Sequence, residues 1–230
     1  MTIRAYAFAG LVFVLAGSGA ALAQQTQAPA GPPPVPHPIG FFVTSTTPAG
    51  SGNLGGLAGA DKICQDLAAS AGAGKRTWHA YLSTQTTQAA PAENARDRIG
   101  SGPWYNAKNV LIAANVEDLH GDRLRDRNDI QKATALTEKG DTIKGAGDTP
   151  NQHDILTGSD SDGRAFPAGL DTTCDNWTSD SDDHKAFLGH ADRTGGQNIS
   201  WNSTHISKGC SAPTLVSTGG AGHLYCFAIN

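Results

Sequence analysis

Acidic side chains are concentrated in two loops in the last third of the chain. Asp160-Ser161-Asp162-Gly163 places two carboxylates two residues apart before a glycine. Many calcium loops begin this way, because alternate side chains and a tight turn can converge on one hard cation. The second loop could add oxygen ligands from Asp175, Asn176, Asp180, Asp182 and Asp183. We take Asp160, Asp162 and Asp182 as the candidate ligands of a calcium site, and calcium is the one cofactor that the sequence suggests.

These acidic residues can also have a purely structural role in turns. Asp and Asn before Gly or Ser commonly accept hydrogen bonds from their own backbone in tight turns, with no metal involved. Both interpretations remain open. Trp201 lies in the polar stretch NISWNST, where an exposed indole could stack on the apolar face of a sugar ring, whereas we expect Trp177 in the core. The candidate ligand-binding residues are Asp175, Asn176, Trp201 and Asn202.

No set of residues predicts catalysis. The eight histidines form no HExxH motif and no Cys/His metal spacing, and no serine lies in GxSxG. Pairs of acidic residues are too frequent in these loops to single out a glycosidase dyad. His153 and Asp154, which are adjacent in the chain, are the one pairing of interest for acid–base chemistry. We predict that the protein is not an enzyme.

The N-terminus has the features of a secretory signal. Arg4 is followed by an apolar run from Ala5 to Ala16, and Ala21-Leu22-Ala23 is a cleavage site. Residues 24–39 form a proline-rich linker, which favours extended polyproline II. No later apolar run approaches 18 residues, so no transmembrane segment is predicted. We expect a secreted, periplasmic or envelope-exposed protein, cut near Ala23, with its domain over residues 40–230.

The composition limits the classes of partner that the protein is expected to bind. Cleavage at Ala23 leaves 207 of the 230 residues, and the loss of Arg4 leaves 16 Lys and Arg against 21 Asp and Glu, a net charge of −5. That acidic balance disfavours nucleic acid. Neutral sugars, cationic partners and divalent cations remain compatible with it. The 28 glycines and the scarcity of aromatic residues predict many tight turns and little helix.

Hydrophobic periodicity locates the main elements. Residues 57–71 repeat apolar residues at helical spacing, with Cys64 on the apolar face, and a short helix is predicted over 92–99. Strands are predicted at 41–45, 77–83 and 109–113, with further strand-like segments at 155–156, 186–188 and 223–229. The four cysteines, in an oxidising compartment, indicate two structural disulfides. Spacing alone leaves all three pairings open.

Several motifs occur in a characteristic order: GADKICQDLA, TWHAYLST, ILTGSDSDGR, TCDNWTS, a tryptophan at 201, GC and LYCF. This order, with the four cysteines, resembles a family of secreted bacterial C-type-lectin-like domains, which is similar to the endostatin domain of collagens XV and XVIII. The resemblance covers roughly residues 41–230. It implies an α+β, C-type lectin-like fold with antiparallel sheets, two helices and long loops. It also implies the disulfides Cys64–Cys226 and Cys174–Cys210.

The chain departs from this family at its metal sites. The Glu-Pro-Asn or Gln-Pro-Asp and Trp-Asn-Asp motifs of calcium-dependent lectins are not intact, since Trp201-Asn202-Ser203 lacks the acidic residue. No N-terminal histidine cluster matches the endostatin zinc site. The resemblance implies a secreted lectin-like protein that binds carbohydrate on a cell surface or glycoconjugate. The alternative is a module of the same fold that binds or adheres to a surface protein, without sugar activity.

Overall fold

A computed structural model of the chain describes residues 36–48, 50–120, 127–193 and 200–230. The predicted signal peptide and most of the predicted linker lie outside the described residues. Within the described ranges, no helix combines the length and the apolar character that crossing a bilayer requires.

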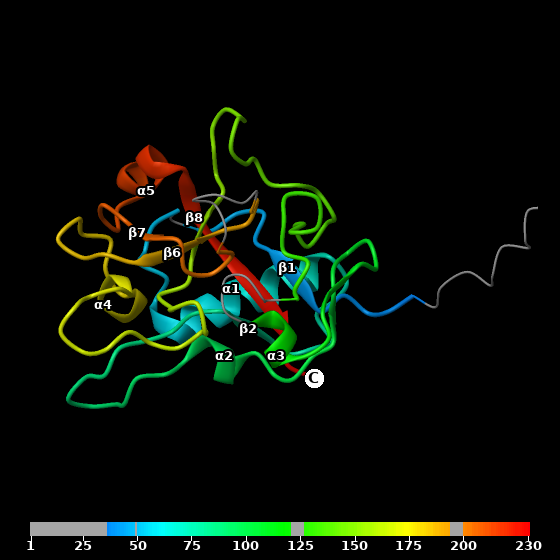
Figure 1. Cartoon of the computed structure of the whole chain (residues 1–230), viewed down its shortest axis with the longest axis horizontal. Helices are drawn as coiled ribbons and strands as arrows, with labels where there is room; N and C mark the ends of the chain where they lie inside the picture. Colours follow the sequence, from blue (N-terminus) through cyan, green and yellow to red (C-terminus); the bar gives the residue numbers. More distant parts are fainter. Residues whose placement is uncertain (1–35, 49, 121–126, 194–199) are drawn as a thin grey trace, which may run out of the picture. The chain divides into compact units, whose positions relative to one another are not determined.

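The fold is α+β, as predicted, and its elements are short apart from one helix and one strand (Figure 1). The helices among the described residues are α1 (Gly56–Ser70), α2 (Ala95–Arg98), α3 (Val116–Leu119), α4 (Cys174–Trp177) and α5 (Ala212–Thr218). The strands are β1 (Phe41–Val43), β2 (Trp78–Ala80), β3 (Trp104–Tyr105), β4 (Leu111–Ala113), β5 (Asp154–Leu156), β6 (Phe187–His190), β7 (His205–Ile206) and β8 (Gly220–Ala228).

Strand β8 organises the main sheet. The strand order is β1-β8-β5-β6-β7, and β2 also pairs with β8. In Figure 1, β8 is the long red strand at the centre, with β1 on one side and β6 and β7 on the other. The pairing of β5 with β8 is parallel, which departs from the purely antiparallel sheets that we predicted. Strands β3 and β4 form a separate two-stranded sheet.

Strand β8 is buried on both faces. Successive side chains of a strand point to opposite sides, and the residues of β8 accordingly divide between two hydrophobic clusters. Leu224 and Cys226 belong to the cluster that contains the apolar face of α1. Tyr225 and Phe227 belong to the cluster on the other side, which includes Trp201. A strand covered on both faces has a continuous apolar sequence, and this explains the apolar run at the end of the chain.

Both predicted disulfides are present. Cys64 of α1 is bonded to Cys226 of β8, which closes a sequence separation of 162 residues. Cys174 is bonded to Cys210 across 36 residues. The first bond ties the long helix to the central strand inside the core. The second bond holds the turn of α4 against the segment that leads into α5.

The helix predicted over 57–71 is confirmed within a residue at each end. Helix α5 was not predicted, because its sequence, APTLVST, reads as part of a Ser/Thr/Gly loop. Its start depends on capping instead: the Ser211 side chain accepts a hydrogen bond from the Thr214 amide, and a proline lies in its first turn. The residue that ends it is Gly219, with a left-handed φ of 103°.

Candidate functional site

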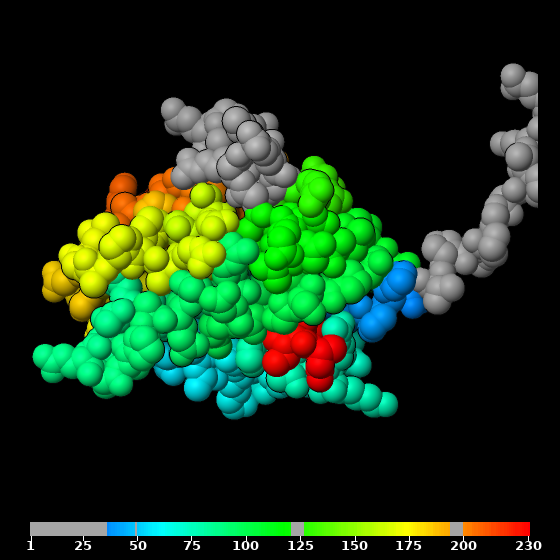
Figure 2. Space-filling model, turned by 60° about the horizontal axis from the view of Figure 1, so that its bottom comes forward, coloured from blue at the N-terminus to red at the C-terminus, as the bar shows by residue number. Residues whose placement is uncertain are grey.

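A small polar pocket opens beside α4. It has a volume of about 160 Å³. Its lining offers hydroxyl, amide, carboxylate and imidazole groups from Gln85, Thr86, Thr87, Asp171, Thr173, Asp175, Asn176 and His184. Figure 2 shows the two contributing parts of the chain side by side on one face, the part that includes residues 85–87 in green-cyan and the part around α4 in yellow. Two of the four predicted ligand-binding residues, Asp175 and Asn176, therefore lie at one pocket.

The backbone of this pocket is unusual. The four residues of α4 have positive φ angles of 49° at Cys174, 54° at Asp175, 51° at Asn176 and 67° at Trp177. This is a single left-handed turn, and a left-handed conformation costs a residue other than glycine roughly 1–2 kcal/mol. Such conformations persist only where the surroundings impose them, and they cluster at functional sites.

Three anchors impose the left-handed turn. Cys174 is held by its disulfide to Cys210. Trp177 is fully buried, and its indole N–H donates to the Ser83 carbonyl at 2.8 Å. The Asn176 side chain accepts from the Gln85 amide at 2.7 Å and donates to the Gln85 carbonyl at 3.1 Å. The side-chain amide of Asn176 thus holds its own residue in the turn and also fixes the backbone of Gln85 in the opposite wall of the pocket.

The charged groups at the pocket are arranged around Asp171. One of its oxygens lies 2.7 Å from Nδ1 of His184, and the carboxylate also accepts from the backbone amides of Thr173 and Asp175. With Nδ1 of His184 engaged, Nε2 is the ring nitrogen left for a ligand. The Asp175 side chain is exposed. The pocket can therefore present carboxylate, imidazole and hydroxyl groups to a small polar ligand.

The predicted calcium ligands do not come together. Among the described residues, none of Asp160, Asp162 and Asp182 belongs to a group of three or more metal-ligating side chains. Oδ1 of Asp160 accepts from the amides of Asp162 and Arg164, each at 2.9 Å. The Asp160 carboxylate therefore accepts hydrogen bonds from the backbone of its own tight turn, as expected for an acidic turn that needs no metal.

The other carboxylates of the predicted calcium set also have protein partners. Asp162 pairs with Arg96 at 3.0 Å and with Arg164 at 3.2 Å. Asp182 accepts from the Ser211 amide at 3.0 Å and from the Thr214 hydroxyl at 2.7 Å. These bonds, first the one from the Ser211 backbone, lower the pKa of Asp182. Asp182 thus supports the start of α5, and the geometry does not support the predicted calcium site.

The prediction that Trp201 offers an exposed stacking face is wrong. The side chain is 1% exposed, and its ring packs 4.7 Å from the ring of Tyr81 and 5.3 Å from that of Tyr225. Asn202 is also buried, and its amide donates to the Tyr81 hydroxyl at 2.9 Å and to the Asp160 carbonyl at 3.1 Å. Both residues belong to the core because the backbone of residues 201–202 packs against Gly189 of β6, and the polar sequence around them gave no sign of burial.

Sequence reasoning missed most of the pocket. Its far wall comes from residues 85–87, about 90 positions before α4, and no motif links the two segments. Asp171 and His184 were also missed. The one usable signal was the composition of the loop after Cys174, which pointed to Asp175 and Asn176. Trp177, predicted in the core, is confirmed there.

Comparison with known proteins gives no assignment: no model of a protein family matches the chain, and none of the curated proteins matches it.

Proposed function

We propose that the protein is a secreted, non-catalytic, lectin-like module that binds carbohydrate in the pocket beside α4. The observation that carries the proposal is the left-handed turn of Cys174–Trp177, which is held by a disulfide, a buried indole and a bidentate amide contact and which forms one wall of the pocket. Maintaining four strained residues next to a polar pocket is most simply explained by a binding role.

The chemistry of the lining suits a polyhydroxylated ligand. Carboxylates such as Asp175 accept hydrogen bonds from sugar hydroxyls, and the Thr86 hydroxyl, which accepts from the Ala92 amide at 3.2 Å, can donate its proton to a ligand. The exposed side chain of Leu170 lies close by, since Gln85 contacts its carbonyl. Leu170 offers an apolar contact for the sugar ring, the role that the sequence suggested for Trp201.

The proposed function goes together with a C-type lectin-like fold and a location outside the cytoplasm. The order of the sequence motifs and the two disulfides support a C-type lectin-like fold of the kind found in secreted bacterial domains and in endostatin. Disulfides are compatible with an oxidising compartment, so we place the protein outside the cytoplasm, released after cleavage near Ala23 or retained in the envelope.

A glycan array tests this function. We expect the oxidised chain to bind a subset of glycans, with competition by free monosaccharide. Binding should be equal with calcium and with chelator, because Asp160, Asp162 and Asp182 are each engaged by protein groups. A correctly folded protein that binds no glycan, but retains a protein partner that sugar does not displace, would establish the protein-binding alternative instead.

Changing Asp175 to glycine should separate binding from stability. Glycine adopts a left-handed conformation without the penalty that a side chain carries, so D175G should raise the free energy of unfolding by about 1 kcal/mol. It also removes a carboxylate from the pocket, and we expect glycan affinity to fall at least about tenfold, which corresponds to one charged hydrogen bond. Urea denaturation and titration with an array-positive glycan measure the two effects.

The matched control is D180G, which removes an exposed carboxylate from the same loop but outside the pocket lining. Its glycan affinity should equal that of the wild type. Equal losses in D175G and D180G would show that the loop acts only through its overall charge.

A further inference from the structure

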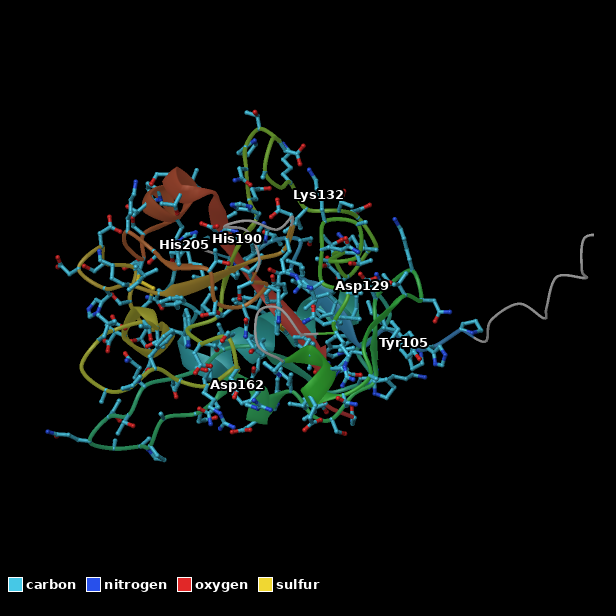
Figure 3. All side chains as sticks on the ribbon, in the orientation of Figure 1. Tyr105, Asp129, Lys132, Asp162, His190 and His205 are labelled. Carbon is cyan, nitrogen blue, oxygen red and sulfur yellow. A yellow bond between two sulfur atoms is a disulfide. The ribbon has the colours of Figure 1, made fainter. Side chains whose placement is uncertain are left out.

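A second cluster of polar side chains lies on the main sheet, away from the pocket. The register pairs Asp154 of β5 with His190 of β6, and His205 of β7 with Leu188, two residues before His190. Since alternate residues of a strand share a face, the sheet brings Asp154, His190 and His205 to one side. Figure 3 shows His190 and His205 next to each other beneath α5, with Asp162 in a different part of the molecule.

The distances match those between the ligands of a tetrahedral metal. Oδ1 of Asp154 lies 3.2 Å from Nε2 of His190 and 3.4 Å from Nε2 of His205. Ligand atoms of all three residues lie within 4.8 Å of one another. In a tetrahedral zinc site with bonds of about 2.0–2.1 Å, neighbouring ligand atoms are about 3.3–3.4 Å apart. One ion can therefore bind all three with small side-chain adjustments.

The buried carboxylate of Asp154 would be stabilised by a bound cation. Its side chain is 1% exposed, and no described donor reaches either oxygen with hydrogen-bond geometry. An ionised carboxylate in such a place is strongly unfavourable unless it is paired or coordinates a metal. Asp192, the neighbouring carboxylate of this cluster, is 2% exposed, so the site combines two buried acidic groups with three imidazoles. A divalent cation would balance their charge.

Neighbouring groups orient the imidazoles. The ring of His153 stacks on that of His190, with centroids 4.1 Å apart and planes at 15°. Nδ1 of His153 lies 2.8 Å from Oδ1 of Asp192, and its Nε2 lies 3.3 Å from Oδ1 of Asp154. Asp192 thus fixes the ring of His153, and the stacked ring of His153 in turn holds that of His190 beside Asp154.

We propose that Asp154, His190 and His205 bind one zinc ion, with His153 and Asp192 as positioning residues. Imidazole nitrogen and carboxylate oxygen together suit zinc, whereas calcium prefers a shell of oxygen ligands. The His205 side chain is 38% exposed, which provides a path for the ion from solvent. The bound ion would join β5, β6 and β7 and keep a coordination position on the side of His205.

Metal binding by the full oxidised chain tests this site. After removal of metal with a chelator and dialysis, we expect calorimetric titration to show one Zn²⁺ per chain and no binding of Ca²⁺. Zinc should raise the melting temperature, since a ligand that binds only the folded state stabilises it. Co²⁺ should bind with the visible absorption of a tetrahedral site.

Variants assign the ligands. H205Q, at the half-exposed ligand, should weaken zinc binding at least about 100-fold, and H153Q should weaken it about 10- to 100-fold, as loss of an outer partner does. H79Q is the control, because His79 also lies near an aspartate, Asp61, at 4.0 Å, but on another part of the sheet. It should bind zinc as the wild type does.

Four outcomes would overturn the proposal. The first is the absence of stoichiometric zinc binding by a protein that circular dichroism shows to be folded. The second is equal zinc affinity of H205Q and the wild type. The third is tighter binding of Ca²⁺ than of Zn²⁺ at this cluster. If D154N raised the melting temperature of the metal-free protein while zinc had no effect on the wild type, the cluster would hold a proton and not a metal.

Discussion

Replacing Cys64 and Cys226 together by alanine is expected to lower the free energy of unfolding by about 5 kcal/mol. The bond closes a sequence separation of 162 residues, and removal of so long a cross-link greatly increases the entropy of the unfolded chain. Both cysteines are fully buried, so the substitution also leaves small gaps beside α1 and β8. Because natural domains are stable by about 5–15 kcal/mol, the variant should be largely unfolded at 37 °C.

Urea denaturation of the wild type and the double variant, both without added reductant, measures this loss. The matched comparison is the double alanine variant at Cys174 and Cys210, which should lose about 4 kcal/mol because its loop is shorter. That second variant should also lose glycan binding, since the bond anchors the left-handed turn. A loss below about 1 kcal/mol for the Cys64–Cys226 pair would contradict the role of this bond in closing the fold.

Acid is expected to destabilise the protein through His120. Burial lowers the pKa of this residue from 6.5 to about 4. Its Nδ1 donates to the Val116 carbonyl at 2.9 Å, and its Nε2 accepts from the Tyr81 hydroxyl at 2.7 Å. Burial disfavours the charged ring, so the folded protein keeps His120 neutral to lower pH than the unfolded chain does. Between pH 6.5 and pH 4 the unfolded chain binds a proton that the folded chain does not, so stability falls with falling pH, by about 3 kcal/mol in all.

The comparison with H120Q isolates this effect. Glutamine does not titrate in this range, so the difference in unfolding free energy between wild type and variant should shrink by about 3 kcal/mol as the pH is lowered from 6.5 to 4. The contributions of the other histidines cancel in that difference. H37Q, at an exposed position, should follow the wild type throughout. A constant difference between wild type and H120Q would show that folding does not lower the pKa of His120.

The parts of the fold that could be predicted were those with a local signal. Helix α1 is marked by apolar residues at helical spacing, and β8 by an unbroken apolar run. The parallel pairing of β5 with β8 has no local signature, because the register of strands so far apart in sequence depends on the packing of the whole sheet. Helix α5 was hidden because capping, and not apolar periodicity, determines where it begins.

The residues of the candidate sites also divide into those with a local sequence signal and those without one. Composition alone pointed to Asp175 and Asn176, which lie at the pocket, but it also pointed to Trp201, which the fold buries against Tyr81 and Tyr225. Polar neighbours in sequence did not predict exposure, since Ser200, Asn202 and Ser203 are themselves buried beside Trp201 and hydrogen-bond with one another. The histidine cluster joins residues 154, 190 and 205, whose spacing matches no metal motif, and only the adjacency of His153 and Asp154 hinted at it.

The most direct test of the account is to locate the bound glycan by amide chemical shifts of the ¹⁵N-labelled, oxidised protein during titration with an array-positive glycan. We predict that the largest changes fall on residues 85–87 and 171–177, the two walls of the pocket. Changes that leave these residues unaffected and fall instead around Asp160–Gly163, or elsewhere on the surface, would contradict the claim that the left-handed turn exists to bind sugar.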